Sequence, residues 1–278
     1  MIHEIYPKKY RVEYYNNKPE PCDTLFLFDG DQICCRLDGN EAVFPRFTEF
    51  SDINDTDFRY LFSIDDERFF TPDICAADPI RPPEGYGWQN VASFRTAGPR
   101  HLAFAAVTAH DLYLWYSQNK YCGRCGAENR HAESERTCVC TKCGLTEYPR
   151  ISPVVIVGVT NGENLLVTRY KDRPYRRYAL VAGFAEIGEA LEDTVRREVF
   201  EETGIHVKNI KYYRSQPWAF TSTLLSGFYC ELDGDPEIRV DEDELAEAIW
   251  LPRGDIPASD IDIALTAEMM EMFRTGKV

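Results

Sequence analysis

Apolar residues follow two different periods along the chain, and each period predicts a different kind of element. Near the N-terminus, short alternating runs such as Thr24–Phe28 predict strands separated by turns. Between Arg100 and Asn119 the apolar residues recur at helical spacing, which predicts one amphipathic helix. The continuous apolar run Val154–Val159 is typical of a buried central strand, and Asn161-Gly162 predicts the hairpin turn that follows it.

The segment after this hairpin predicts a mixed α/β sandwich. Leu165–Thr168 has the composition of the returning strand. A third apolar run, Ala179–Gly183, ends in a glycine and precedes a charged helical stretch. Strands that alternate with helices within one segment favour a sheet covered by helices.

Composition narrows the class of protein. Of the 278 residues, 44% are hydrophobic and 28% are charged, which is ordinary for a globular protein and excludes wholesale disorder. No apolar run reaches the about 20 residues that a spanning helix needs, and the first residues lack an apolar signal core. We therefore expect a cytoplasmic protein that does not bind membranes. The net charge of −15 repels phosphate backbones and argues against general nucleic-acid affinity.

Five of the ten cysteines crowd into residues 122–143, and four of them form two C-x-x-C-G knuckles. This spacing suits a tetrahedral site of four thiolates around zinc, and such a site has no position left for water. We therefore expect a structural zinc ion. Cys138 competes with Cys140 as a ligand, but only Cys140 recreates the knuckle. The predicted ligands are Cys122, Cys125, Cys140 and Cys143.

Two roles are open for this cysteine ribbon. It either stabilises a small module that lacks a core of its own, which we favour, or it reads nucleic acid. Between Lys120 and Arg150 there are six Lys or Arg residues against four Glu residues, a local charge of +2. That excess is weak support for an RNA contact, because single-stranded binding uses more basic and aromatic side chains.

Three glutamates share one face of the charged helical stretch. Glu198, Glu201 and Glu202 are spaced i, i+3 and i+4, which places them within an arc of about 100°. A solvated acidic face is the ordinary explanation of such a run. The alternative is a site for a hard cation built of oxygen ligands, with two arginines directly before it. Gly204 is expected to end the helix as its C-cap.

The same stretch resembles the Nudix box, G-x5-E-x7-R-E-U-x-E-E-x-G-U, where U is aliphatic. Every fixed position is met, by Gly183, Glu189, Arg197, Glu198, Val199, Glu201, Glu202, Gly204 and Ile205. The resemblance implies a Nudix hydrolase, an α/β/α sandwich that uses Mg²⁺ or Mn²⁺ to cleave nucleoside diphosphates linked to another moiety. It implies that the three helix glutamates bind these cations, with Glu202 or a neighbour as general base and Glu189 supporting the metals. By the same likeness Arg197 orients a carboxylate, and Gly183 lets the backbone approach the metal or substrate.

Downstream, Ser215–Thr223 is similar to the SQPWPFPxS signature of NADH pyrophosphatases, a family within the Nudix group. Ala219 and Thr221 replace prolines, and Thr223 replaces a serine. The alternative for this stretch is a strand with an aromatic core pair, which is less favoured because Gln-Pro-Trp is of an exposed type. The resemblance implies substrate-binding positions at Gly183, Phe184, Tyr148, Ser215, Gln216, Trp218, Phe220 and Ala264. Phe184 is expected to stack on the nicotinamide or base, and Tyr148 to reach across a homodimer interface.

Near the end, Glu244–Trp250 matches the family segment E-L-x-E-A-x-W, whose first Glu is a further metal or catalytic ligand. A plain helix-start acid is the alternative reading of Glu244. A zinc ribbon directly before the Nudix domain is also the family layout. The expected parts are an N-terminal mixed α/β domain (1–95), a connecting helix (96–120), the zinc ribbon (121–150) and the Nudix domain (151–278).

These expectations give a metal-dependent hydrolase that cleaves NAD(H) between its phosphates into nicotinamide mononucleotide and AMP. Removal of an NAD cap from RNA 5′ ends, or broader ADP-ribose and dinucleotide pyrophosphatase activity, is the alternative with the same chemistry. A non-catalytic nucleotide sensor is the alternative from another class, and it is disfavoured because degenerate sensors usually lose box carboxylates, whereas this sequence keeps them all.

Overall fold

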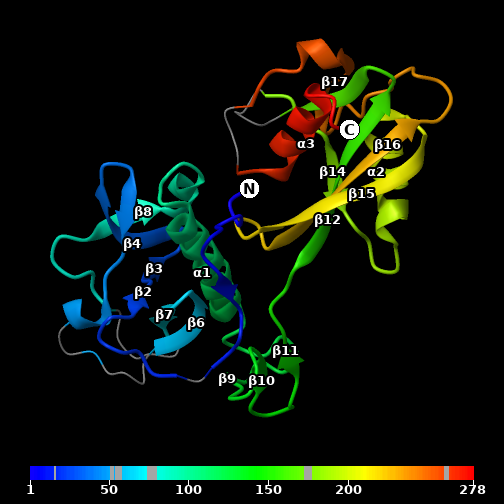
Figure 1. The fold of residues 1–278 in the computed structure, drawn as a ribbon. Helices are drawn as coiled ribbons and strands as arrows, with labels where there is room; N and C mark the ends of the chain where they lie inside the picture. Colours follow the sequence, from blue (N-terminus) through cyan, green and yellow to red (C-terminus); the bar gives the residue numbers. More distant parts are fainter. Residues whose placement is uncertain (16, 51–52, 54–57, 74–79, 172–176, 260–262) are drawn as a thin grey trace. The chain divides into compact units, whose positions relative to one another are not determined.

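The computed structural model describes residues 1–278 except 16, 51–52, 54–57, 74–79, 172–176 and 260–262 (Figure 1). It divides into two compact units. The N-terminal unit contains residues 2–150 and 219–221, and the C-terminal unit contains Met1, 151–218 and 222–278. Among the described residues, no helix combines the length and the apolar character needed to cross a membrane.

The N-terminal unit holds two four-stranded sheets and a long helix. One sheet has the order β1-β6-β7-β2, and the other has β3-β4-β5 with β8 paired to β4. The predicted helix is confirmed as α1 (Arg100–Gln118), which packs on β6 and β7. The other elements are β1 (Tyr10–Arg11), β2 (Thr24–Leu25), β3 (Phe28–Asp29), β4 (Gln32–Asp38), β5 (Glu41–Val43), η1 (Phe47–Glu49), β6 (Phe58–Ile64), β7 (Glu67–Pro72), β8 (Gly87–Asn90) and η3 (Val91–Arg95).

The cysteine ribbon forms a small antiparallel sheet within this unit. Its strands are β9 (Asn129–His131), β10 (Cys138–Cys140) and β11 (Thr146–Glu147), in the order β11-β10-β9. The ring of His131 lies 3.4 Å from a carboxylate oxygen of Asp73, and the hydroxyl of Tyr14 donates to the carbonyl of Ala132. Because these contacts join the ribbon to segments that precede α1, the division of residues 1–150 into three parts stays a prediction.

The C-terminal unit is built on one mixed six-stranded sheet of order β15-β16-β12-β13-β17, with β14 paired to β12. β12 and β16 are parallel, and the other pairs are antiparallel. The predicted hairpin at Asn161-Gly162 is confirmed, and Gly162 takes the positive φ that this turn requires. The strands are β12 (Ser152–Asn161), β13 (Asn164–Tyr170), β14 (Val181–Phe184), β15 (Val207–Trp218), β16 (Thr223–Leu232) and β17 (Leu245–Pro252).

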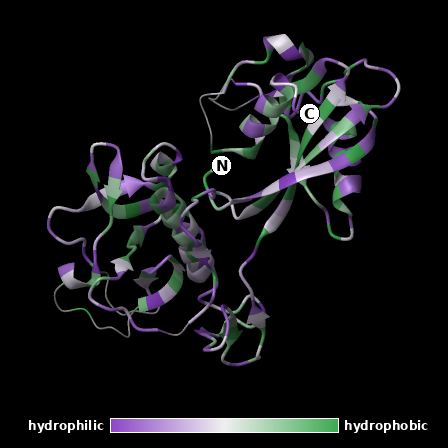
Figure 2. Ribbon diagram, viewed as in Figure 1, coloured by the Kyte–Doolittle hydropathy of each residue, from purple (hydrophilic) through white to green (hydrophobic). Residues whose placement is uncertain are grey.

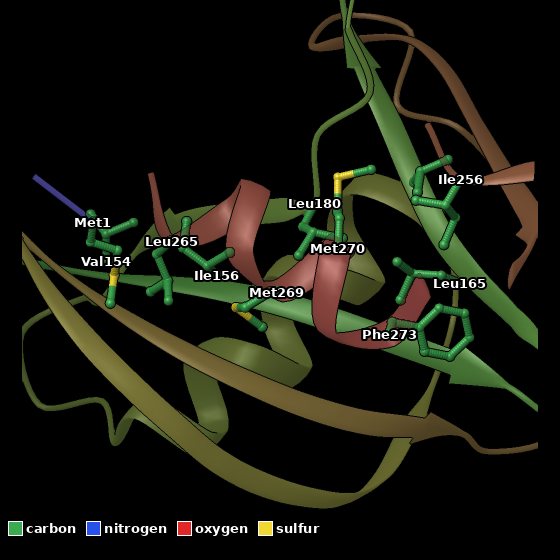
Figure 3. Close-up of a cluster of buried hydrophobic side chains, with 11 residues drawn as sticks. Met1, Val154, Ile156, Leu165, Leu180, Ile256, Leu265, Met269, Met270 and Phe273 are labelled. Carbon is green, nitrogen blue, oxygen red and sulfur yellow. The ribbon is translucent and has the colours of Figure 1, made fainter. Parts of the chain in front are cut away.

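Alternate residues of β12 face different helices, since side chains alternate along a strand. Val155, Val157 and Val159 belong to the core under α2 (Leu191–Thr203). Val154 and Ile156 belong to the core under α3 (Leu265–Arg274), together with Met1 (Figure 3). The unit is therefore an α/β/α sandwich, as the resemblance implied, with the short helix η4 (Arg253–Asp255) after β17.

The sequence pattern predicts only one of the two helices that cover the sheet. α2 ends at Gly204, whose φ of 69° confirms the predicted glycine C-cap. α3 is not among the elements that the sequence pattern predicts. It carries both hydrophilic and hydrophobic residues (Figure 2), and its buried face includes Leu265, Met269 and Phe273.

Candidate active site and zinc centre

Arg197, on α2, is the centre of a hydrogen-bonded cluster. Its Nε and NH2 groups donate to the two carboxylate oxygens of Glu189, over 2.9 and 2.8 Å. Its NH1 group donates to Glu198 (2.7 Å) and Glu201 (3.0 Å), and NH2 also donates to the carbonyl of Phe184 (2.9 Å). These bonds use all five N–H donors of the guanidinium, so one side chain fixes three carboxylates and the end of β14.

Both carboxylate oxygens of Glu189 accept hydrogen bonds within this cluster. Besides Arg197, the hydroxyl of Thr194 and the backbone N–H of Glu186 donate to its carboxylate. The bonds from Arg197, followed by that backbone bond, lower the pKa of Glu189 to about 2. Both oxygens therefore accept hydrogen bonds, and the predicted support of Glu189 for the metals stays a prediction.

Glu198 lies directly against the backbone of Gly183. A Cβ atom at Gly183 would lie 1.9 Å from Cδ of Glu198 and 2.1 Å from one of its oxygens. A side chain at this position would therefore have to displace the Glu198 carboxylate, which Arg197 holds. Gly183 pairs with Val155, on the face that α2 covers, and this pairing brings the first residue of the box under the helix.

Glu202 is the buried member of the acidic face, with 2% of its surface exposed. Burial and then repulsion by Glu198 and Glu244 raise the pKa of Glu202 to about 8. Its Oε2 atom is buried without a hydrogen-bond partner among the described residues. An ionised carboxylate in such a place is costly unless a proton or a cation accompanies it.

The two remaining predicted acids are more exposed. Glu201 is bonded to Arg197, and its side chain is 57% exposed. Glu244 directly precedes β17, so the alternative reading as a helix-start acid is wrong. Its charge helps to raise the pKa values of Glu198 and Glu202, which places it within electrostatic range of both, although burial is the larger cause.

The structure adds two residues to the acidic site that the sequence analysis does not name. Thr194 holds Glu189, as described, and Asp241 donates its backbone N–H to the carbonyl of Glu202. The charge of Asp241 also contributes to the raised pKa of Glu202. The acidic run from Asp241 to Glu244 is the sequence signal that could have indicated it.

The pairing of the strands places the start of the Ser215–Thr223 motif in the same rows of the sheet as Gly183 and Phe184. Gln216 pairs with Leu225, which pairs with Val154, which pairs with Phe184. This row lies on the face that α3 covers, because Val154 and Leu225 pack in that core. The neighbouring row, from Ser215 through Ser226 and Val155 to Gly183, faces α2.

The exposure of the motif residues differs from the expectation. Gln216 is fully buried, so its interpretation as an exposed type is wrong. The alternative is right that Ser215–Trp218 is strand, since it forms the end of β15. Phe184 is 57% exposed and Trp218 is partly buried.

Three predicted substrate positions lie outside these rows. Ala264 is the N-cap residue of α3. Phe220 lies in the turn between β15 and β16 and groups with the N-terminal unit, where its ring centre is 4.2 Å from the guanidinium carbon of Arg95. Tyr148 follows β11 and is 61% exposed. Because Phe220 and Tyr148 belong to the other unit, their place at the acidic site stays a prediction.

The four predicted zinc ligands converge. Among the described residues, they form the one group of three or more candidate ligands whose atoms lie within 4.8 Å of one another. The sulfurs of Cys122 and Cys143 are 3.7 Å apart, and those of Cys125 and Cys140 are 3.5 Å apart. A tetrahedron with Zn–S bonds of about 2.3 Å has edges of about 3.8 Å, so the spacing fits zinc and not disulfides.

Cys138 points to a different partner. Its sulfur lies 3.8 Å from Nδ1 of His131 and is buried. Backbone N–H groups of Lys142 and Cys143 donate to the sulfur of Cys140, as a thiolate knuckle requires. The contacts of the two cysteines therefore favour Cys140 over Cys138 as the ligand.

We predict that Cys140→Ala abolishes zinc binding, whereas Cys138→Ala retains about one zinc ion per chain. Both changes remove a buried thiol from the same strand, so the pair is matched. Zinc content by mass spectrometry and melting temperature measure the outcome. Equal zinc content in both variants would contradict the assignment of ligands.

We predict that Gly183→Ala lowers the hydrolysis rate with NADH, the expected substrate, by about 10²-fold, because the new methyl group must displace the Glu198 carboxylate. Gly254→Ala is the control, since a Cβ atom there would meet no atom within 4 Å. The rate is measured together with the circular dichroism spectrum. A fully active, folded Gly183→Ala enzyme would show that the close contact is unimportant.

The chain is similar to known proteins over both the zinc ribbon and the segment that contains the acidic cluster. Residues 149–272 match the family model of the NUDIX domain, and residues 117–148 match that of the NADH pyrophosphatase zinc ribbon domain. The NAD-capped RNA hydrolase NudC of Pseudomonas fluorescens is 32% identical, over 85% of this chain and 84% of that protein. Its namesake from Pseudomonas aeruginosa is 34% identical over 70% of each chain.

A solved NUDIX hydrolase from Nitrosomonas europaea aligns with 55% of this chain and 90% of its own, at 25% identity and a TM-score of 0.49. The two family models cover the box and the ribbon, and the Pseudomonas relatives extend over most of the chain. The chain therefore belongs to the Nudix hydrolases, in the NADH pyrophosphatase family whose members carry a zinc ribbon before the Nudix domain.

Proposed function

We propose that the protein hydrolyses the pyrophosphate bond of NAD(H), giving nicotinamide mononucleotide and AMP, with the help of Mg²⁺ or Mn²⁺. The observation that carries the proposal is the unpartnered, buried oxygen of Glu202 beside the carboxylates that Arg197 holds. The second motif lies in register with the box, and the ribbon matches a model named for NADH pyrophosphatases. Both observations support a dinucleotide as substrate.

The carboxylates fit a divalent cation by their chemistry. Glu198, Glu201, Glu202 and Glu244 would hold it, since hard cations of this size take oxygen ligands. The buried orphan oxygen of Glu202 and the space that Gly183 leaves for Glu198 support this fit. When bound, such cations neutralise charge on the two phosphates and lower the pKa of water.

Three residues of the protein have separate roles in proton transfer, in positioning the carboxylates and in binding the substrate. Glu202 has an oxygen free of hydrogen bonds and can accept the proton of the attacking water. Arg197 has no donor left for substrate, so its role is to keep Glu198 and Glu201 in place. The exposed ring of Phe184 offers a flat apolar surface for the nicotinamide or the base, and Arg197 fixes that residue through its carbonyl.

An NAD cap on RNA is the second candidate substrate, because it presents the same pyrophosphate. The names of the Pseudomonas relatives favour it. The local charge of +2 on the ribbon supports an RNA contact, while the net charge of −15 opposes one. A homodimer to which the exposed Tyr148 contributes, and a cytoplasmic location, belong to the same proposal.

We predict that Glu202→Gln lowers turnover by about 10²- to 10⁴-fold, because the variant loses a proton acceptor and a negative charge at the buried position. Glu192→Gln, an exposed change on the same helix, is the matched control and keeps full activity. Steady-state rates and melting temperatures measure the effect. Near-normal turnover in folded Glu202→Gln enzyme would remove Glu202 from the chemistry.

Substrate choice is tested by chromatography of products from NADH, NAD⁺, ADP-ribose and NAD-capped RNA in equal competition. We expect AMP and nicotinamide mononucleotide, reduced when NADH is cleaved, from the free dinucleotides. Preference for capped RNA would select the second candidate. Absence of hydrolysis of all four by zinc-loaded protein with Mg²⁺ or Mn²⁺ would refute the proposed function.

A further inference from the structure

Gln216 is unusual among the motif residues because its side chain is buried and forms hydrogen bonds with the protein backbone. It is fully buried in β15. Its Nε2 group donates to the carbonyl of Ile263 over 2.6 Å, and its Oε1 atom accepts the backbone N–H of Leu265 over 2.6 Å. The amide thus binds the backbone on both sides of Ala264.

These bonds replace a helix cap. Leu265 is the first residue of α3, and the N-cap residue Ala264 has no side-chain oxygen to accept the unpaired N–H groups of the first turn. Gln216 supplies that acceptor from a strand that lies 49 residues earlier in the sequence. The position of residues 263–265 therefore depends on a side chain of the sheet.

The anchored turn lies at the box end of the sheet. Leu265 belongs to the same core as Val154, and Figure 3 shows the two side chains close together. Val154 in turn pairs with Phe184, whose ring is exposed and whose carbonyl accepts a hydrogen bond from Arg197. The first turn of α3 therefore lies over the sheet row that ends at Phe184.

From Glu268, in its first turn, onward, α3 is held by bonds that do not involve Gln216. The hydroxyl of Tyr213 and NH1 of Arg214 each donate to Glu268 over 2.7 Å, and the hydroxyl of Tyr229 donates to the carbonyl of Met269 over 2.6 Å. With these bonds present, loss of Gln216 would release the start of the first turn, residues 263–265, while the helix stays attached from Glu268 onward.

We infer that Gln216 is a positioning residue: it fixes the first turn of α3 as one wall of the dinucleotide site and acts on substrate affinity through that wall. It does not touch the substrate, because both ends of its amide are occupied and its side chain is buried. This inference rests on the proposed function, and it assigns the amide of the motif's glutamine to the backbone rather than to the ligand.

The first test is Gln216→Met, which keeps length and loses both hydrogen bonds. We expect KM for NADH to rise about tenfold with kcat nearly unchanged, since Gln216 lies in the row that faces α3, whereas the carboxylates lie on the side of α2. Hydrogen exchange, which needs no activity, should accelerate at Leu265 and stay unchanged in α2. Tyr213→Phe is the matched control: it removes a different bond between β15 and α3 and should leave KM unchanged.

The second test is Gln216→Glu, which has a pH signature that a merely structural role would not give. The protonated carboxyl can donate to Ile263 and accept from Leu265 as the amide does, whereas the ionised form cannot donate. KM should therefore be nearest normal at low pH and rise, relative to wild type, as pH increases through the raised pKa of the buried carboxyl.

Each result bears on one claim. Faster exchange at Leu265 together with a raised KM supports the inference. Unchanged exchange, or faster exchange with unchanged KM, in an enzyme that hydrolyses NADH would overturn it while the proposed function stands. A wild-type protein that hydrolyses no dinucleotide would overturn the proposed function and the effect on affinity together, even if exchange at Leu265 still changed.

Discussion

The bonds of Arg197 set the arrangement of the whole acidic site. One guanidinium faces Glu189, Glu198 and Glu201 and spends every N–H donor on them and on the end of β14. Like charges on one helix face repel, so without this cation the glutamates would spread toward solvent. Arg197 holds them, and Glu202 remains buried with an unpartnered oxygen. The site is thus organised but still short of positive charge, which is the condition that favours a divalent cation.

The sheet places residues of the Nudix box and residues of the Ser215–Thr223 motif in two neighbouring rows. Adjacent residues of β14 face opposite sides: Gly183 faces α2 and the carboxylates, and Phe184 faces α3. Two neighbouring residues of β15, Ser215 and Gln216, repeat this division in the same two rows. The proposed metal ligands and the Phe184 ring therefore lie on opposite faces of the sheet, and each face is covered by a different helix. The zinc ribbon belongs to the other unit, where the sulfur atoms of four of its cysteines converge.

Short-range patterns in the sequence are enough to predict many elements of the fold and the cysteine cluster. The central strand, the hairpin at Asn161-Gly162, the glycine cap of α2 and the cysteine knuckles each depend on residues close together in the chain. Helix α3 and the burial of Gln216 could not be predicted in this way. α3 begins at Leu265, its N-cap residue Ala264 has no capping side chain, and its cap comes from a residue 49 positions before Leu265. The close contact of Glu198 with Gly183 is likewise a tertiary feature: the box names both residues, but only the fold shows why glycine is needed.

Binding of Mn²⁺, followed by electron paramagnetic resonance on zinc-loaded protein, tests the central claim most directly. The central claim is that the carboxylates held by Arg197 form a divalent-cation site. Wild type and Glu192→Gln should bind Mn²⁺ alike, because Glu192 is exposed and lies outside the cluster. Glu198→Gln should bind it much more weakly while keeping its zinc and its melting temperature. Equal Mn²⁺ affinity in all three proteins would contradict the account, because the cation would then be held elsewhere.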